Sequence, residues 1–212
     1  EAEHRNYTVV EPTSVISTYL VELVRRHADE LLTRQEVNRL LDHLKETAAK
    51  LVEEVIPNVL KPGEVQRVLQ GLLRERVPIR DLESIVEAIA DVASRTKDAE
   101  ILTEYARNAL ARTLCHQHKA DDGRIHCITL DPSLEQLIGK SLERSEHGTT
   151  LTLPPQVQTK IVAAIRTQVE KAATATRGRP PVLLTPPQIR LWLRKMLEVQ
   201  LPSVAVLSYN EI

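Results

Sequence analysis

Apolar residues recur every three or four positions through the first half of the chain, which is the spacing of amphipathic helices. A helix is predicted from Pro12 to about Leu32, with its apolar side at Ile16, Leu20, Leu23, Val24 and Leu31. Further stripes predict helices at Val37–Leu44, Leu51–Ile56, Val65–Leu73, Leu82–Ala93 and Ile101–Leu110. Short connections between these helices predict a compact helical bundle over residues 33–112.

Several short motifs mark where these helices begin. The T-x-x-E motif of Thr33 and Glu36 predicts a capping box, in which each side chain bonds the backbone of the other residue. Pro62 and Gly63 are expected to separate two helices. Pro78 is expected to form a tight start to the next helix, with Arg80 and Asp81 in its first turn and Asp81 favouring the helix dipole. Asp98 is expected to cap one more helix.

The second half alternates strands with helices. Apolar runs at 125–130, 181–185 and 204–208 predict strands, and 149–153 is a candidate edge strand. Helices are expected at 131–142, with Asp131 as cap, at 155–172 and from Pro186 to about Val199. A strand followed by a helix and a second strand predicts a right-handed parallel β-α-β unit. The fold class is therefore α+β and multidomain: an all-α bundle, then a small α/β subdomain with a three- to four-stranded sheet.

A short strand is also predicted at residues 7–10, far along the chain from any strand that could pair with it. Because an unpaired strand offers free backbone groups to other chains, two copies are expected to associate through it. The chain does not begin with Met, so we expect it to be a piece of a longer protein.

The amino-acid composition disfavours several classes of function. The 212 residues are 42% hydrophobic, enough for a core, and the formal net charge is −1. One Trp, four Tyr and no Phe leave few rings for stacking on bases, so nucleic-acid binding is not expected. Two cysteines form no disulfide framework, and no apolar run reaches the roughly 20 residues that span a bilayer. These features favour a cytosolic domain.

One cluster could hold zinc: Cys115, His116, His118, His126 and Cys127. Its spacing is not that of a zinc finger, and His126 and Cys127 would point to opposite faces of a strand, so an ordinary helix end, turn and strand are the favoured interpretation. A second group could form a basic patch for an acidic partner or nucleic acid, although a solvated face is favoured: Arg177, Arg179, Arg190, Arg194 and Lys195. Phosphate-loop, dinucleotide and hydrolase motifs are absent, so neither an enzyme nor a bound cofactor is predicted.

Several segments resemble the C-terminal cytoplasmic domain of the FlhA family, the flagellar type III export-gate proteins. They include "YTVVEPTSVISTYL", "LLTRQEVNRLLDHL", "VPIRDLESIVEAIA" and "VLSYNEI", in unbroken order over essentially the whole chain. The resemblance implies three parts: the tail of a first subdomain at 1–32, a helical subdomain at 33–111 and an α/β subdomain at 112–212. A virulence type III export-gate domain is the alternative.

The resemblance also implies partners and site residues. Family members carry an N-terminal membrane domain, so the expected location is the cytoplasmic face of the bacterial inner membrane. They form a homo-oligomeric ring, expected to be nonameric, that receives export substrates and chaperones and contacts the export ATPase complex. Of the residues that form the family's chaperone pocket, only the positions that match Val10 and Thr18 are present in this chain. Weak chaperone binding, or none, is therefore expected. Pro78 matches a gating position, with Arg80 and Asp81 in a packing role, and subdomains are expected to rotate about 29–34 and 111–124.

Overall fold

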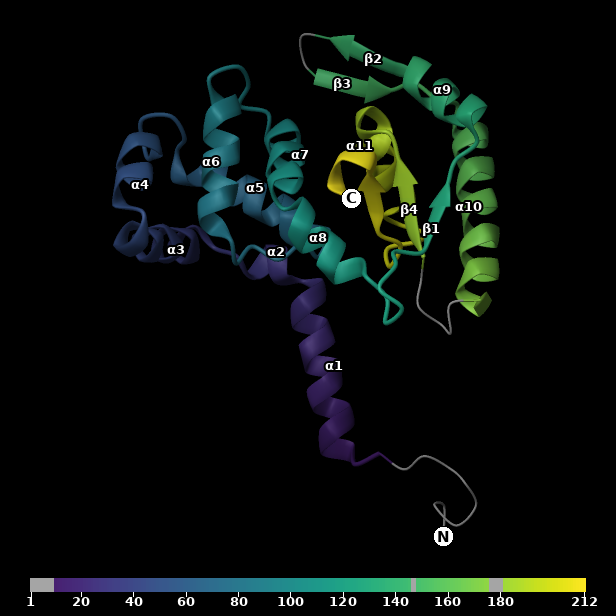
Figure 1. Cartoon of the computed structure of the whole chain (residues 1–212), viewed down its shortest axis with the longest axis horizontal. Coiled ribbons are helices and arrows are strands. Elements are labelled where there is room, and N and C mark those ends of the chain that lie inside the picture. Colours follow the sequence, from purple (N-terminus) through teal and green to yellow (C-terminus); the bar gives the residue numbers. More distant parts are fainter. Residues whose placement is uncertain (1–9, 146–147, 176–180) are drawn as a thin grey trace. The chain divides into compact units, whose positions relative to one another are not determined.

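The computed structural model describes residues 10–145, 148–175 and 181–212 (Figure 1). The chain divides into two compact units, Glu1–Ala106 and Arg107–Ile212, and each is described by itself. The three-part division inferred from the sequence stays a prediction. The strand expected at 7–10 lies outside the described residues except for Val10, which has no regular secondary structure.

Unit 1 is helical, as the apolar periodicity predicted. In chain order its helices are α1 (Pro12–Arg26), α2 (Ala28–Leu31), α3 (Arg34–Thr47), α4 (Ala49–Val55), α5 (Pro62–Arg74), α6 (Leu82–Ala93) and α7 (Ala99–Ala109), the last of which continues past the end of the unit. Its fully buried side chains come mainly from α3, α5, α6 and α7. They are Val37, Leu60, Val65, Val68, Leu69, Leu72, Ile85, Val86, Ile89, Leu102 and Ala106.

Two helix bounds differ from the predictions. The helix expected to run from Pro12 to Leu32 ends at Arg26, because His27 leaves helical geometry at φ −110° and ψ 21°, and the short α2 follows. Pro62 and Gly63 do not separate two helices but are the first residues of α5. Proline suits that position, since the first helical N–H has no partner within the helix.

The helix caps are partly as predicted. The Thr33 side chain accepts a hydrogen bond from the Glu36 N–H at 3.2 Å. Glu36 does not reach back; its carboxylate pairs with Arg39 at 2.6 Å, and the Thr33 N–H donates to the Leu31 carbonyl. Asp81 is the N-cap residue of α6 and not part of its first turn, and its carboxylate accepts from the Ser84 N–H at 3.2 Å.

One glycine permits close packing inside unit 1. A Cβ added at Gly71 on α5 would lie 2.8 Å from the hydroxyl oxygen of Thr103 on α7. That separation is shorter than a van der Waals contact, so α5 and α7 approach each other as they do only because residue 71 lacks a side chain.

Unit 2 is built on a three-stranded parallel sheet of order β1-β4-β5. The strands are β1 (Cys127–Thr129), β4 (Val182–Thr185) and β5 (Val206–Ser208), and the last two are wholly buried. The helices are α8 (Ala111–His118), α9 (Pro132–Lys140), α10 (Pro155–Ala175), α11 (Pro187–Leu197) and the terminal 3-10 helix η2 (Tyr209–Glu211). Asp131 caps α9 as predicted, accepting from the Ser133 N–H. These features confirm the predicted α+β class.

A hairpin replaces the predicted edge strand. β2 (Leu142–Ser145) pairs antiparallel with β3 (Gly148–Leu151) in a sheet of its own. The expected helix to 142 therefore ends two residues early, and the strand near 149–153 does not join the main sheet. The segment after Lys140 is short and mostly polar, so it carries no periodic apolar signal. Its strand forms by pairing with β3 of the same chain.

Candidate docking surface

The most prominent exposed apolar surface in unit 1 lies on α1. Every residue of α1 except Glu22 is exposed, and Ile16, Tyr19 and Leu20 keep 59%, 66% and 51% of their surface accessible. The helix forms locally: Pro12 occupies its first turn, and Arg25 and Arg26 lie in the last turn, where cations favour the helix dipole.

Six of these side chains form one face, which we call the α1 stripe: Val15, Ile16, Tyr19, Leu20, Leu23 and Val24. Ile16, Leu20 and Leu23 are spaced by four and three residues, so their side chains lie along one side of the helix. Contiguous exposed apolar surface of this kind marks a contact surface, for a partner or for another part of the longer protein.

The two residues assigned to chaperone binding do not extend this stripe. Val10 is 55% exposed and precedes the helix. Thr18 is two residues from both Ile16 and Leu20, which turns it to the other side of α1, and its hydroxyl donates to the Ser14 carbonyl at 2.8 Å. The role of Val10 and Thr18 therefore stays a prediction, and a partner that contacts Thr18 would meet the polar side of α1.

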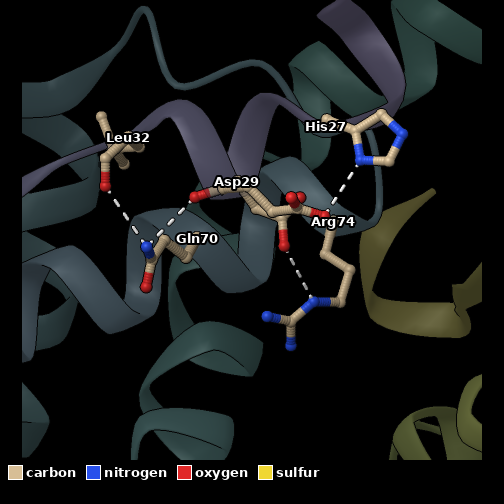
Figure 2. Close-up of polar contacts among 6 residues, drawn as sticks. His27, Asp29, Leu32, Gln70 and Arg74 are labelled. Atoms are coloured by element: carbon tan, nitrogen blue, oxygen red, sulfur yellow. Dashed lines mark hydrogen bonds and ion pairs between the residues drawn. The ribbon is translucent and has the colours of Figure 1, made fainter. Parts of the chain in front are cut away.

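A group of polar contacts joins the segment that follows α1, residues 27–32, to α5 (Figure 2). The Gln70 side-chain amide, from α5, donates to the carbonyls of Asp29 at 3.1 Å and Leu32 at 3.2 Å. Arg74 Nε donates to the Asp29 carboxylate at 3.2 Å, and His27 contacts Glu30 at 2.9 Å. Figure 2 shows Gln70 between the two carbonyls, so one side chain bonds both to Asp29, within α2, and to Leu32, which follows α2.

Arg76, which follows α5, contacts α1 itself. Its guanidinium pairs with the Glu22 carboxylate at 2.7 Å. Arg76 has φ of 59°, and the Val77 and Arg76 N–H groups donate to the Leu72 and Leu73 carbonyls. This is the Schellman pattern that ends α5, usually with glycine at the left-handed position. An arginine there accepts backbone strain and directs its side chain to α1.

The predicted gating segment directly precedes α6, so Arg80, which was predicted in the first turn of this helix, lies before it. Pro78 and Ile79 are half-buried, whereas Arg80 and Asp81 are exposed. The Asp81 carboxylate is used in the cap of α6. The packing side of this segment is therefore Pro78 and Ile79, and the proposed roles of Pro78, Arg80 and Asp81 in gating stay predictions.

The cysteine and histidine residues do not converge. Cys115, His116 and His118 lie on α8, His126 precedes β1, and Cys127 is an exposed residue of β1. The Cys115 thiol donates to the Glu211 carbonyl at 3.2 Å, and His126 contacts Asp122. Partial burial raises the pKa of the Cys127 thiol. Within residues 10–145, 148–175 and 181–212, no three potential metal ligands come together.

The favoured interpretation of a solvated face and the alternative of a basic patch are both wrong for Arg190 and Arg194. Arg190 and Arg194 are buried, and their guanidinium groups donate to carbonyls that include those of Val206 and Val204. Lys195 lies 4.6 Å from the centre of the Trp192 ring. Arg177 and Arg179 lie outside the described residues. Periodicity could not show that α11 turns two arginines inward.

Sequence reasoning missed a buried ion pair in unit 2. Arg107 Nε lies 2.6 Å from Glu211 Oε1, with side chains 2% and 1% exposed. The other Glu211 oxygen accepts from the Ser208 N–H at 2.6 Å, and Arg107 also donates to the Val206 carbonyl. The S-x-x-E spacing of Ser208 and Glu211 is a helix-start signal that could have predicted η2. Nothing in the sequence pointed to Arg107 as the partner.

His118 belongs to the same region. Burial lowers its pKa, the positive charge of Arg107 lowers it further, and the negative charge of Glu211 opposes both effects. A neutral imidazole is therefore favoured beside a buried cation.

Comparison with known proteins decides the family. The FHIPEP family model matches residues 1–212. The chain belongs to the FHIPEP family. It is similar to "Flagellar biosynthesis protein FlhA" of Bacillus subtilis, with 40% identity over 212 residues, which is all of this chain and 31% of the relative. It thus spans about a third of the length of that relative. The resemblance of the segments from "YTVVEPTSVISTYL" to "VLSYNEI" to the FlhA family is confirmed.

Solved structures of similar proteins share the fold. Nonameric EPEC SctV-C has a TM-score of 0.81 at 29% identity, covering 93% of this chain and 58% of that one. CdsV in the Chlamydia pneumoniae CdsV and CdsO complex has a TM-score of 0.82 at 27% identity, covering 100% and 61%. The chain is therefore similar to type III secretion domains of both flagellar and virulence systems. No helix in the described residues is long and apolar enough to cross a membrane.

Proposed function

We propose that this FHIPEP chain is part of the cytoplasmic domain of a flagellar type III export gate and acts there as a docking scaffold. Its partners would be export substrates, their chaperones and components of the export ATPase complex. The match to FlhA over the whole chain carries the proposal. The flagellar branch is favoured over the virulence branch because identity is 40% to FlhA and 29% to SctV-C.

Two assemblies of similar proteins support the scaffold role. SctV-C is nonameric, which supports a ring of this chain's full-length protein, and CdsV was solved with CdsO, which supports a protein partner. The proposed activity is binding and not catalysis, and it needs no cofactor. The location would be the cytoplasmic face of the inner membrane, with membrane spans in other parts of the longer protein.

Within this scaffold, Val10 and Thr18 would contribute to chaperone binding, and Pro78, Arg80 and Asp81 would set the packing of α6. The exposure of Val10 and Thr18 is compatible with contact to a partner. Half-burial of Pro78 is compatible with a packing role, since a change there moves the start of α6 relative to its neighbours.

A chimera tests the export role. Bacillus subtilis FlhA would carry this chain in place of its own matched segment, and motility and secreted flagellin would be measured in a strain lacking FlhA. Export at a rate above that of the empty strain is expected. A chimera present at the normal level that secretes nothing would contradict the proposal.

Chaperone binding is tested separately on the same chimera. Purified flagellar chaperone–substrate pairs would be titrated against its cytoplasmic part by calorimetry. Thr18→Ala is expected to weaken binding, whereas Ser17→Ala, a neighbouring exposed hydroxyl, is the matched control. Equal affinities for the two variants would remove Thr18 from the site.

A further inference from the structure

The outer edge of β5 and of the residues before it is covered by side chains and not by a further strand. β5 lies at one end of the three-stranded sheet, and on its inner side the Leu183 N–H of β4 donates to the Ala205 carbonyl at 2.8 Å. Backbone groups of alternate residues point to opposite edges of a strand, so those of Val204, Val206 and Ser208 point away from β4. Each of these three residues is only 2% exposed.

Two buried arginines converge on the Val206 carbonyl. Arg107 Nη2, from the last turn of α7, and Arg190 Nη1, from α11, each lie 3.3 Å from this oxygen. The two side chains are 2% and 0% exposed. Desolvation of a guanidinium is costly, so stability alone does not explain why two of them share one carbonyl.

The other outward backbone groups are bonded by charged side chains too. Arg194 Nη1 lies 3.4 Å from the Val204 carbonyl and 3.4 Å from the Pro202 carbonyl. The Ser208 N–H donates to the Glu211 carboxylate at 2.6 Å. Every second residue from Pro202 to Ser208 therefore has a backbone group bonded to a buried charged side chain, in the places where a neighbouring strand would bond.

Unpaired backbone groups along an edge strand allow a strand of another chain to add to the sheet, and inward-pointing charges are one means by which proteins prevent this. We propose that the β5 edge is closed to strand addition by four buried side chains, which we call the β5 edge cover: Arg107, Arg190, Arg194 and Glu211. Arginine suits this use because its planar group carries five donors, so one side chain can serve two carbonyls. The inference concerns unit 2 alone and is independent of the export function.

Arg190→Met combined with Arg194→Met tests the β5 edge cover. Methionine keeps an unbranched chain but cannot donate, so the Val204 carbonyl loses its donor and the Val206 carbonyl loses one of two. Sedimentation over a concentration series is expected to give an association constant at least about 10-fold above that of the natural chain. Hydrogen exchange of residues 204–208 should become slower as the concentration rises, because an added strand would bond their N–H groups.

Leu193→Ala is the matched control on the same helix. Leu193 is fully buried in the apolar core of unit 2, so its truncation lowers stability by leaving a cavity and removes no donor from the β5 edge. The association constant of the natural chain is expected. Equal association in the control and in the arginine variant would show that instability is the cause and would overturn the proposal.

A milder pair of variants keeps the test decisive if the double variant does not fold. Arg194 is the most exposed of the three arginines, at 8%, and Arg194→Met alone removes the donor to the Val204 and Pro202 carbonyls. Arg194→Lys keeps a charged donor and is expected to associate less than Arg194→Met. An arginine variant with the association of the natural chain, equal association of the lysine and methionine variants, or slower exchange confined to residues 127–129 of β1 would overturn the proposal.

Discussion

Arg107 and Glu211 carry opposite charges that are both buried in unit 2. Their interaction is short, and each carries further hydrogen bonds to the backbone near β5. A buried pair of this kind contributes less than its short distance suggests, because both ions have lost water. Removal of one partner is costly for the same reason, since it leaves the other charge buried without compensation.

We therefore expect Glu211→Ala to destabilise unit 2 by about 3–5 kcal/mol. Trp192, the only tryptophan, lies on α11, so its fluorescence during urea unfolding reports this unit. Asp122→Ala, which removes exposed contacts to His126 and to the Arg124 N–H, is the control and is expected to shift the midpoint far less. Arg107→Leu combined with Glu211→Leu is expected to recover part of the loss. A double variant as unstable as the sum of its single changes would contradict this account.

His118 gives unit 2 a pH dependence of definite sign. Its folded pKa is lowered from 6.5, chiefly by burial and then by Arg107. Below about pH 6.5 the unfolded chain therefore binds more protons at this residue than the folded chain does, and stability falls as the pH falls toward the folded pKa.

The expected result is a larger loss of stability between about pH 7.5 and about pH 5 in the natural chain than in His118→Asn, which cannot take up the proton. The measurement is the urea midpoint of Trp192 fluorescence at both pH values. Equal losses in the two proteins would show that His118 does not cause the dependence.

At the scale of elements, the segment from α1 to α5 shows how a predicted hinge is held. Residues 29–34 were expected to be a short connection about which subdomains rotate, and Gln70 bonds two carbonyls within it. Gln66 also donates to the Leu32 carbonyl, at 2.9 Å. Motion there would have to break bonds from half-buried side chains, which is more costly than breaking exposed ones.

Gln70→Ala is expected to loosen this segment, because it removes the side-chain donor to the Asp29 carbonyl at a cost of about 1 kcal/mol, whereas the Leu32 carbonyl keeps its bond from Gln66. Hydrogen exchange of residues 28–33 should become faster. Arg67→Ala is the matched control on the same helix, because Arg67 is exposed and donates only to the Gly63 carbonyl, at 3.4 Å. Similar exchange in both variants would show that the carbonyl bonds do not hold the turn.

At the scale of the whole molecule, the charge distribution opposes nucleic-acid binding. The formal net charge is −1, and Arg190 and Arg194 are used inside unit 2. Affinity for nucleic acid comes mainly from basic side chains that meet phosphates and release counterions.

We expect no binding of double-stranded DNA by this chain at physiological salt, measured by fluorescence anisotropy. Micromolar affinity with a steep dependence on salt would contradict this expectation. In that case Arg194→Ala would separate the possibilities, since a buried arginine should alter stability and leave DNA affinity unchanged.

The apolar periodicity by itself determined most helices, the buried strands β4 and β5, and the α+β class. This information is local: helix period, proline position and caps such as Asp98 and Asp131 act within a few residues. The same locality explains why the break at His27 and the β2–β3 hairpin were not visible in the sequence. Both depend on contacts with other segments of the same chain.

Only the tertiary structure decided which polar groups are buried and with whom. The separation of 104 residues between Arg107 and Glu211 leaves no periodic trace, and the inward turn of Arg190 and Arg194 follows from how α11 packs on β5. The reverse holds for α1, where the sequence shows an apolar stripe but only the structure shows that the described residues leave it uncovered. Burial is a property of neighbours in space, which a linear pattern does not contain.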